Sequence, residues 1–579
     1  MIRGLFTRQA NIFALTAAVM LFTEIFSFLY LAEVSDRIRI LFLTSLLDTA
    51  FLLSPYFILP PKWRRGIWIL FLLLPVFTLT ELLYLEHFGN FYYGNIIFAG
   101  KITDKSVVSS ALSLLKPAYI LLFLPSLLLI APYILLRKEI LTQRYSVRTR
   151  GVWFCLILCI PLCAYFLTGR RYYKSAGPEK VASEQAVYCN YHIFNDPSWK
   201  PQLAMNYGVS GLFIRTLCDI FPQRISIDEK QRREITAILS TSSRTETADS
   251  LFSGNKTKNL ILLIVESLNS SVFRLPEAKE ICPNLYGLMQ DSSSVYVPEV
   301  LSQTGPGNSS DGQLMYNTGL YPVSYMPFVT EYGMSDYPSI AKALKSHSNS
   351  EIIYEDQQLW NHWSTTRSYG FRHLYSELYD ESNKGKDEDY HVISKVIEVA
   401  DTISRPFFLQ VTTYSTHEPY DRLRISPVLK LSDTSKSKFD TKTLNYLQTV
   451  GYFDRQLGRL LAALDSLGLK ESTILAIVGD HSAPSAAMSP ILDCNTVPLI
   501  ITNTGVTQKY DGTIGQIDLF PTLLDVMSVE EYILPQTGKN YCGLGRSIFS
   551  SHDADTASIP TDSLRRLSEL MILSRFFDR

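Results

Sequence analysis

The stretch NLILLIVES, from Asn259 to Ser267, decides the fold of the C-terminal half of this chain. Six consecutive apolar residues lie between an asparagine and Glu266. A short, continuous apolar run bounded by polar residues is typical of a strand in a parallel sheet that is covered on both faces. We therefore predict a buried strand that places the Glu266 carboxylate at the carboxyl edge of a sheet.

Similar runs recur downstream, at SEIIYED (350–356), PFFLQVTTYSTHEPY (406–420), STILAIVGDHS (472–482) and VPLIITN (497–503). Helical apolar spacing separates them, at PSIAKALKSH (338–347) and TVGYFDRQLGRLLAALDSLGL (449–469). Strands that alternate with helices predict right-handed crossovers and an α/β sandwich around a mainly parallel sheet. Ligands bind such sheets beyond the carboxyl ends of the strands.

Upstream, five apolar runs are long enough to cross a membrane, which takes about 20 helical residues. They are roughly Asn11–Ala32, Ile40–Pro60, Gly66–Leu85, Pro117–Leu136 and Gly151–Thr168. Lysine and arginine cluster before the first run, between the second and third, and between the fourth and fifth. Because positive charge favours the cytoplasmic side, we expect a cytoplasmic N-terminus and an extracytoplasmic chain after Gly169.

Three acidic residues, Glu24, Asp48 and Glu81, fall within these runs. A carboxyl group inside a membrane is costly and is often functional or paired with a neighbour. Protonation, or a position near the membrane surface, would equally explain each of them.

The predicted organisation is a five-helix transmembrane domain (1–169), a juxtamembrane connector (170–256), an extracytoplasmic catalytic domain (257–550) and a C-terminal helical tail (551–579). The net charge of −1 over 579 residues gives no support for nucleic-acid binding, which requires a basic face. The eight cysteines include no CxxC pair, so neither a zinc knuckle nor a dense disulfide framework is indicated.

Two of the predicted strands are followed by residues of types that commonly bind metal ions. Glu266 follows one apolar run, and Asp480 and His481 follow another. Carboxylate oxygens and imidazole nitrogens suit divalent cations, and neighbouring parallel strands can bring them to one point. Strands also commonly exit into polar residues that have no such role. The segment TGPGNSSDGQ, from Thr304 to Gln313, adds hydroxyl groups that would complete a nucleophile-on-metal arrangement.

These motifs together resemble the alkaline phosphatase/sulfatase superfamily, and in particular the lipoteichoic acid synthase-like transferases. In chain order, the matching segments are IVES, CPNLYGLM, QTGPGNSSDGQLMYNTGLYP, WNHWSTTRSYGF, STHEPY, GYFDRQLGRLL, VGDHS and QIDLFPTLLDV. They cover roughly residues 257–530, and the five-span anchor also fits the family.

The resemblance implies a site with one or two divalent cations, Mn²⁺ or Zn²⁺, held by Glu266, Ser309, Asp480 and His481. Ser309 stands at the nucleophile position of a GNSSD turn, where the family has threonine in a GKTSD-like turn. The CxPxR and SxPxR patterns of sulfatases are missing from this stretch, which argues against a standard sulfatase.

The resemblance also implies substrate contacts from Asp356, Trp360, Asn361 and His417, the last a candidate acid or base. His362 stands where the family has an arginine. Arginine grips phosphate with two parallel hydrogen bonds and histidine does not, so phosphoglycerol and phosphoethanolamine both remain candidate headgroups.

The resulting expectation is a multi-pass protein of a prokaryotic cytoplasmic membrane. It would move a phospholipid headgroup, through a covalent serine intermediate, to a glycan or lipid acceptor of the envelope. A sulfatase-like hydrolase of sulfuric or phosphoric esters is the alternative enzyme, and an inactive scaffold is the alternative from another class. The oligomeric state is left open.

Overall fold

The computed structural model describes residues 9–88, 91–92, 94, 112, 114–176, 200–220, 225–241, 251–418, 420–421, 429, 431–483, 492, 494–506, 508–510, 512–529, 532–550 and 561–578. The chain forms two compact units. One comprises Met1–Ile96 and Ala111–Pro222, and the other Ile97–Ser110 and Gln223–Arg579. The division falls inside the predicted connector. Cys189 and most of the aromatic-rich segment 86–101 lie outside the described residues.

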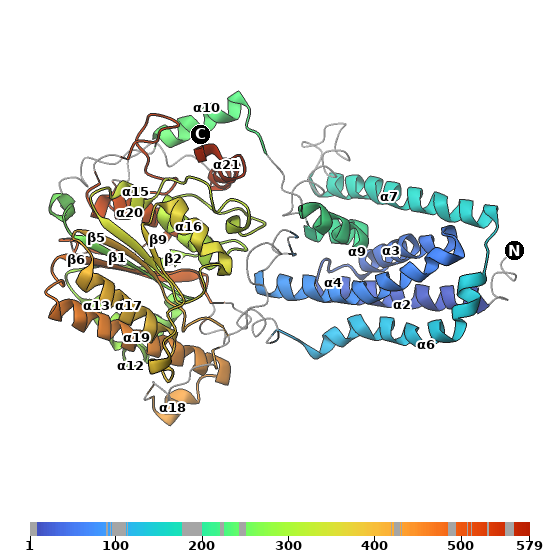
Figure 1. The fold of residues 1–579 in the computed structure, drawn as a ribbon, viewed down its shortest axis with the longest axis horizontal. Helices are drawn as coiled ribbons and strands as arrows, with labels where there is room; N and C mark the ends of the chain where they lie inside the picture. Colours follow the sequence, from blue (N-terminus) through green and yellow to red (C-terminus); the bar gives the residue numbers. More distant parts are fainter. Residues whose placement is uncertain are drawn as a thin grey trace. The chain divides into compact units, whose positions relative to one another are not determined.

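Helices cover all five predicted spans in the N-terminal unit: α2 (Gln9–Leu31), α3 (Ile38–Ile58), α4 (Ile67–Phe88), α6 (Ile120–Thr142) and α7 (Val147–Ala176) (Figure 1). A sixth helix, α9 (Lys200–Asp219), packs against α3. Among the described residues, four segments have the length and hydropathy of a membrane-crossing helix: Asn11–Leu31, Ile38–Ile58, Pro117–Thr142 and Val147–Leu167. The apolar N-terminal helices are confirmed, and the prediction that five of them cross a membrane stays a prediction.

The acidic residues within these helices are paired with polar groups of the same unit. Ser126 Oγ on α6 donates a hydrogen bond to Glu24 at 2.8 Å, and the Ser210 hydroxyl on α9 donates to Asp48. Glu81 accepts a hydrogen bond from a backbone N–H just beyond α4. The sequence left open whether these carboxyl groups are paired with neighbours or are simply protonated or near the membrane surface. The structure shows that each of them is hydrogen-bonded to a neighbouring group.

The C-terminal unit contains one mixed sheet. Its nine strands within the described residues are β1 (Asn259–Val265), β2 (Ser294–Leu301), β3 (Ser348–Ile352), β4 (His373–Tyr375), β5 (Phe407–Thr412), β6 (Thr473–Gly479), β7 (Thr496–Thr502), β8 (Gln508–Lys509) and β9 (Thr513–Gly515). Their order is β4-β3-β5-β1-β6-β7-β2-β8, and β9 also pairs with β2. The run from β4 to β6 is parallel, whereas β7 is antiparallel to both of its neighbours. The predicted mainly parallel α/β sandwich is confirmed.

Helices lie on both faces of this sheet (Figure 1). The helices of this unit are α10 (Glu229–Thr241), α12 (Ala278–Ile281), α13 (Pro283–Gln290), α14 (Ser309–Thr318), α15 (Ile340–Ala343), α16 (His362–Tyr369), α17 (Glu388–Thr402), α18 (Asp433–Lys436), α19 (Thr441–Ser466), α20 (Leu519–Val526) and α21 (Thr561–Leu573). In the figure, α13, α17 and α19 cover one face, and α15, α16 and α20 cover the other. Helix α21 lies in the predicted C-terminal tail.

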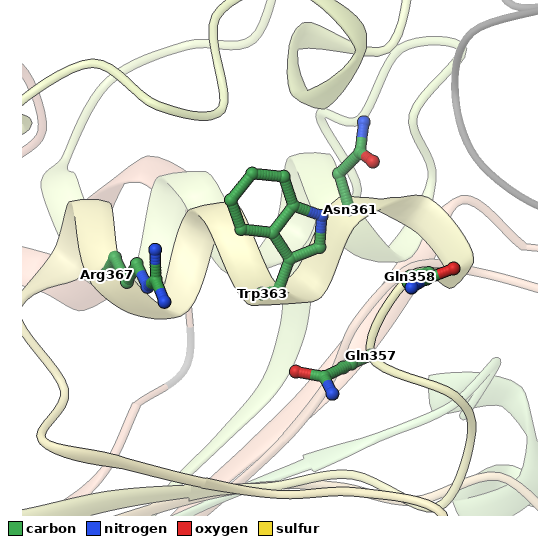
Figure 2. A pocket seen from close by; sticks show the side chains of 5 residues that line it. All are labelled: Gln357, Gln358, Asn361, Trp363 and Arg367. Atoms are coloured by element: carbon green, nitrogen blue, oxygen red, sulfur yellow. The ribbon is translucent and has the colours of Figure 1, made fainter.

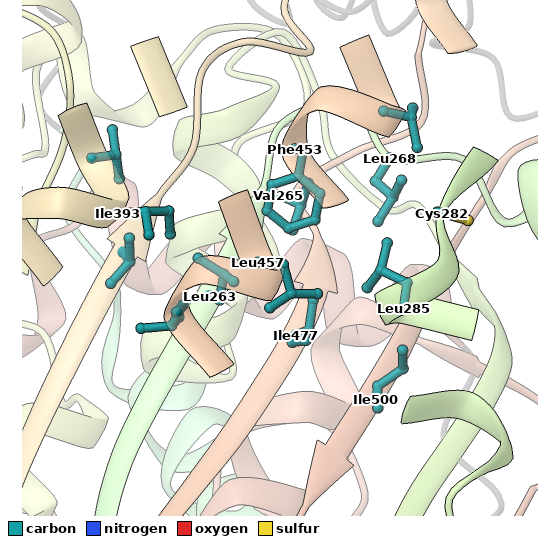
Figure 3. Packing of buried hydrophobic residues seen from close by; sticks show 14 of the residues in the cluster. Leu263, Val265, Leu268, Cys282, Leu285, Ile393, Phe453, Leu457, Ile477 and Ile500 are labelled. Atoms are coloured by element: carbon teal, nitrogen blue, oxygen red, sulfur yellow. The ribbon is translucent and has the colours of Figure 1, made fainter. Parts of the chain in front are cut away.

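The central strand β1 is fixed by burial on both faces. All seven of its residues are buried. Leu263 and Val265 join a hydrophobic core with Ile393 of α17 and Leu457 of α19 (Figure 3). Full burial of one such side chain contributes about 1.5–3 kcal/mol to folding. This packing holds the carboxyl end of β1 in one place.

Strand register brings the predicted metal ligands together. In the parallel pair of β1 and β6, Val265 lies opposite Gly479. The next residues along the two strands are Glu266 and Asp480. They therefore leave the sheet side by side at its carboxyl edge, where a ligand site is expected.

Candidate functional site

Glu266, Asp480 and His481 form a buried cluster in which one ligand atom from each lies within 4.8 Å of the others. His481 Nε2 is 3.4 Å from a Glu266 oxygen and 3.6 Å from an Asp480 oxygen. The other ring nitrogen, Nδ1, lies 2.9 Å from the carbonyl oxygen of Ser482. A carbonyl accepts only from a protonated nitrogen, so Nδ1 carries the hydrogen, and in the neutral ring Nε2 presents its lone pair to the cluster.

Ser309 completes the cluster from the first residue of α14. Its hydroxyl donates a hydrogen bond of 3.0 Å to Glu266 Oε2, and its side chain is half-buried. The adjacent Ser310 is buried and donates instead to the carbonyl of Gly307 at 2.9 Å. Of the two neighbouring serines, the structure therefore places Ser309 at the cluster.

A buried carboxylate shapes the turn that presents Ser309. Asp311 Oδ2 accepts hydrogen bonds from the backbone N–H groups of Gly305 and Gly307, both at 2.9 Å. A Cβ atom on Gly307 would lie 2.2 Å from Asp311 Oδ1, so the turn requires glycine there. Burial raises the pKa of Asp311 to about 7 despite these hydrogen bonds. The sequence analysis did not single out Asp311, although it belongs to the GNSSD motif.

The three buried ionisable groups alter one another's pKa values. Burial, followed by the negative charge of Glu266, raises the pKa of Asp480 above its ordinary value. Burial alone would raise the pKa of Glu266, but the hydrogen bond and charge of His481 lower it. Burial opposes protonation of His481, yet the charge of Asp480 and the contact with Glu266 raise its pKa. Two carboxylates this close repel each other, and a cation between them removes that cost.

The side-chain oxygen and nitrogen atoms of the cluster suit a divalent cation. Asp480 Oδ1 accepts hydrogen bonds from the N–H groups of Ser267 and His481, both at 2.7 Å. Asp480 Oδ2 is buried and has no hydrogen-bond partner among the described residues. A buried carboxylate oxygen without a donor is costly, and a metal ion would satisfy it. Two carboxylates, one imidazole and one hydroxyl are ligands that Zn²⁺ and Mn²⁺ accept.

A second layer of polar groups holds the cluster's backbone. The Tyr446 hydroxyl donates to the carbonyl of Ser267 at 2.8 Å and accepts from the N–H of Asn269 at 3.0 Å. Gln516 Nε2 donates to the carbonyl of Asp480 at 2.5 Å. The sequence analysis assigned no role to these side chains, although Gln516 opens the QIDLF motif.

Helix α14 approaches β6 so closely that only glycine fits at residue 312. A Cβ atom there would lie 2.4 Å from the backbone oxygen of Asp480. We expect Gly312→Ala to displace Ser309 from the cluster and to lower the free energy of unfolding by about 1–3 kcal/mol, the usual cost of overpacking. Chemical unfolding and metal affinity of the purified protein measure both effects.

Gly287→Ala is the matched control, because Gly287 also lies within a helix and a Cβ atom there would have nothing within 4 Å. Alanine is favoured over glycine inside helices by about 0.5–1 kcal/mol, so the control should be neutral or stabilising. Equal behaviour of the two variants would contradict the close approach of α14 to Asp480.

His417 follows β5 on the same edge of the sheet. Its ring stacks on Tyr414 with ring centroids 5.4 Å apart and an angle of 13° between the planes. Its Nδ1 lies 2.5 Å from the carbonyl oxygen of Glu418. The half-buried ring is thus held in one orientation with Nε2 directed away from that carbonyl.

The other predicted substrate contacts lie in the segment after β3. Asp356 Oδ1 accepts a hydrogen bond from the N–H of Gln358 at 2.9 Å. Asn361 Nδ2 donates to the carbonyl of Val329 at 3.0 Å. The side chain of Trp360 lies outside the described part of the structure. Substrate contact by these residues stays a prediction.

His362 is turned into the domain. It is 6% exposed, with Nδ1 3.9 Å from Glu351 and Nε2 3.7 Å from Glu355. Burial opposes protonation, but the contact with Glu355 and the charge of Glu351 raise the pKa of His362. Glu351 also accepts hydrogen bonds from Thr366 at 2.5 Å and from Gln410 at 3.0 Å. His362 therefore joins buried carboxylates to helix α16, and its contact with a substrate stays a prediction.

A pocket opens beside this segment. It has a volume of about 540 Å³ and is lined by Gln357, Gln358, Asn361, Trp363 and Arg367 (Figure 2). The sequence analysis placed only Asn361 in a binding role. Trp363 and Arg367 lie four residues apart on α16, so they share one helix face.

Comparison with known proteins defines the class of the C-terminal unit. The sulfatase family model matches residues 258–529. Together with the sheet topology and the acidic cluster at its carboxyl edge, this match gives the unit an alkaline phosphatase/sulfatase-like fold, preceded in the chain by apolar helices.

Within this class, the chain is similar to lipoteichoic acid synthases, as the motifs indicated. It is 25% identical over 317 residues to lipoteichoic acid synthase 2 of Bacillus subtilis, covering 51% of this chain and 47% of that protein. It is 26% identical over 322 residues to lipoteichoic acid synthase of Staphylococcus aureus, covering 51% and 48%. These alignments span about half the length of the curated relatives.

One solved structure shares the fold over most of both chains. It is the integral membrane protein lipooligosaccharide phosphoethanolamine transferase A (EptA) from Neisseria meningitidis. The TM-score is 0.52 at 13% sequence identity, and the match covers 90% of this chain and 95% of that one. At this identity the likeness concerns the fold alone.

Proposed function

We propose that this protein is a membrane-anchored, divalent-metal-dependent phosphotransferase that moves a phospholipid headgroup, through a covalent intermediate on Ser309, to a glycan or lipid acceptor of the envelope. The observation that carries the proposal is the 3.0 Å hydrogen bond from Ser309 to Glu266 within the cluster of Asp480 and His481. Similarity to proteins named lipoteichoic acid synthases supports it.

Glu266, Asp480, His481 and Ser309 would hold the metal ion, which lowers the pKa of a bound hydroxyl and offsets charge on phosphate when present. In the first half-reaction, Ser309 Oγ attacks the phosphorus of the headgroup and gives up its proton to solvent. The new bond joins this oxygen to phosphorus, and the bond from phosphorus to the diacylglycerol oxygen breaks. A protonated His417 supplies the proton that the departing alcohol needs.

In the second half-reaction, neutral His417 removes a proton from the acceptor hydroxyl. The acceptor oxygen then attacks phosphorus, the bond to Ser309 breaks, and the serine oxygen recovers a proton from solvent. The buried walls of the cluster limit competition from water. A substrate held in the membrane also stays at high local concentration near a membrane-anchored domain.

A phosphorylated headgroup on Ser309 is the expected result when the purified full-length chain, loaded with Mn²⁺ or Zn²⁺, is incubated with phospholipid. We expect phosphatidylglycerol or phosphatidylethanolamine, tested one at a time, to release diacylglycerol and to leave an adduct that peptide mass spectrometry locates. An adduct on another residue, or none with either lipid, would contradict the mechanism.

Hydrolysis of a sulfuric or phosphoric ester is the second candidate function, because the matching family model is that of sulfatases. The two functions differ in the final acceptor. A transferase releases little free headgroup without an acceptor, whereas a hydrolase releases it continuously. Cleavage of a sulfate ester, with no diacylglycerol released from either lipid, would favour the hydrolase.

The proposed orientation puts the N-terminus in the cytoplasm and the catalytic unit outside a prokaryotic cytoplasmic membrane. The lysine and arginine clusters between the apolar runs support it. Protease added to spheroplasts should digest the catalytic unit and spare a tag at the N-terminus. Digestion of the tag together with protection of the catalytic unit would reverse the assignment.

A further inference from the structure

We propose that the pocket on the outer face of α16 binds a sugar that carries a phosphate group, with Trp363 against the sugar ring and Arg367 on the phosphate. The assignment of this ligand as part of the acceptor rests on the proposed transferase function, but the binding itself does not. None of the residues of the predicted metal cluster lines this pocket.

The polar groups of the pocket are available for a ligand. Trp363 is 36% exposed, and the guanidinium of Arg367 lies 5.7 Å from the centre of its ring. Within the described part of the chain, neither the indole N–H nor the guanidinium has a hydrogen-bond or ion-pair partner. The side-chain amides of Gln357 and Gln358 also line the pocket (Figure 2).

These groups match the chemistry of a phosphorylated sugar. An exposed indole offers a flat apolar surface for the C–H face of a sugar ring, with an N–H at its edge. Side-chain amides donate to and accept from hydroxyl groups. A guanidinium forms two parallel charge-assisted hydrogen bonds with a phosphate. Among the described residues that line the pocket, Arg367 is the one that is charged, so the ligand should carry a negative group.

The pocket is linked to strand β3 of the sheet through the neighbouring, buried face of the same helix. Thr366 and His362 on the inner face contact Glu351 of β3. Strand β3 pairs in parallel with β5, and β5 with β1, so their carboxyl ends lie on one edge. The lining residues 357–361 follow the carboxyl end of β3, which lies on the same edge of the sheet as the end of β1 before Glu266.

Isothermal titration of the full-length Ser309→Ala protein in detergent tests the site without turnover. The probes are glucose 6-phosphate, glucose and inorganic phosphate. We expect glucose 6-phosphate to bind at least about tenfold more tightly than either other probe, because only it uses both the indole and the guanidinium. Trp363→Ala and Arg367→Gln, added singly, should each weaken its binding about tenfold or more.

Arg372→Gln is the matched control, because Arg372 is an exposed arginine of the following segment that does not line the pocket. It should leave the dissociation constant of glucose 6-phosphate unchanged. Binding that is unaffected by either pocket substitution, or equal binding of inorganic phosphate and glucose 6-phosphate, would overturn the inference. Adduct formation on Ser309 in the unaltered chain is measured separately, so failure of the transferase proposal and failure of this one give different results.

Discussion

Replacing Ser309 by alanine is expected to lower headgroup transfer by at least about 10⁴-fold, the scale seen when a nucleophile is removed from an enzyme. Of the two serines in the turn, Ser309 donates its hydroxyl to Glu266 Oε2 at 3.0 Å, whereas Ser310 donates to Gly307. The metal should remain largely bound, because Glu266, Asp480 and His481 are unchanged. Diacylglycerol release measures the activity, and elemental analysis measures the bound metal.

Ser310→Ala is the comparison that separates the nucleophile from its neighbour. The Ser310 hydroxyl donates to Gly307 within the turn, so its loss should cost about 0.5–1.5 kcal/mol of stability and leave transfer within about tenfold of the unaltered chain. Near-normal turnover by Ser309→Ala would remove Ser309 from the mechanism and direct attention to Ser310 or Thr304.

The second large effect is expected from Asp480→Asn, which should reduce metal affinity by at least about 100-fold, or roughly 3 kcal/mol. The side-chain oxygen of asparagine can still accept from Ser267 and His481, as Asp480 Oδ1 does at 2.7 Å. The fold is therefore preserved, while the charge of Oδ2, which accepts no hydrogen bond from the described residues, is lost. Transfer should fall with the metal.

Thermal unfolding with and without chelator distinguishes loss of metal from loss of structure. The unaltered chain should melt at a lower temperature after metal removal, because a ligand that binds only the folded state stabilises it. Asp480→Asn should melt at the same temperature with or without chelator. It should be no less stable than the metal-free unaltered chain, since repulsion from Glu266 is removed.

Asp454→Asn is the control for loss of a buried carboxylate. Asp454 is 1% exposed and accepts from the backbone N–H of Leu285 at 2.7 Å, away from the cluster. This variant should lose stability and keep its metal. Full metal occupancy of Asp480→Asn would contradict the assignment of Asp480 as a ligand.

The sequence by itself determined five strands of the sheet, β1, β3, β5, β6 and β7, and the chemical character of the sheet's carboxyl edge, whereas β2, β4, β8 and β9 were not predicted. The run from Leu260 to Val265 is apolar throughout because β1 is buried on both faces, and such a run is visible without any knowledge of its neighbours. Glu266 and the pair Asp480-His481 stand directly after apolar runs, so local sequence was enough to place them where strands end. The apolar N-terminal helices were equally plain from hydropathy.

Tertiary structure decided what depends on contacts between distant segments. The register that sets Val265 opposite Gly479 joins positions more than two hundred residues apart. The resemblance had named Ser309, but the physical difference between Ser309 and Ser310 lies in the tertiary contacts of their hydroxyls, one to Glu266 and the other to Gly307.

The surroundings of helix α16 show the same limit. His362 occupies a position at which the resemblance implied a substrate contact, but its ring lies between Glu351 and Glu355 because β3 packs beneath the helix. Trp363 and Arg367 read as ordinary residues of a short helix. They line a pocket because the 357–361 segment folds beside that helix. Hydropathy and residue type are local properties of the sequence. Strand register, the orientation of a side chain and the shape of a pocket depend on contacts between segments that are distant in the sequence.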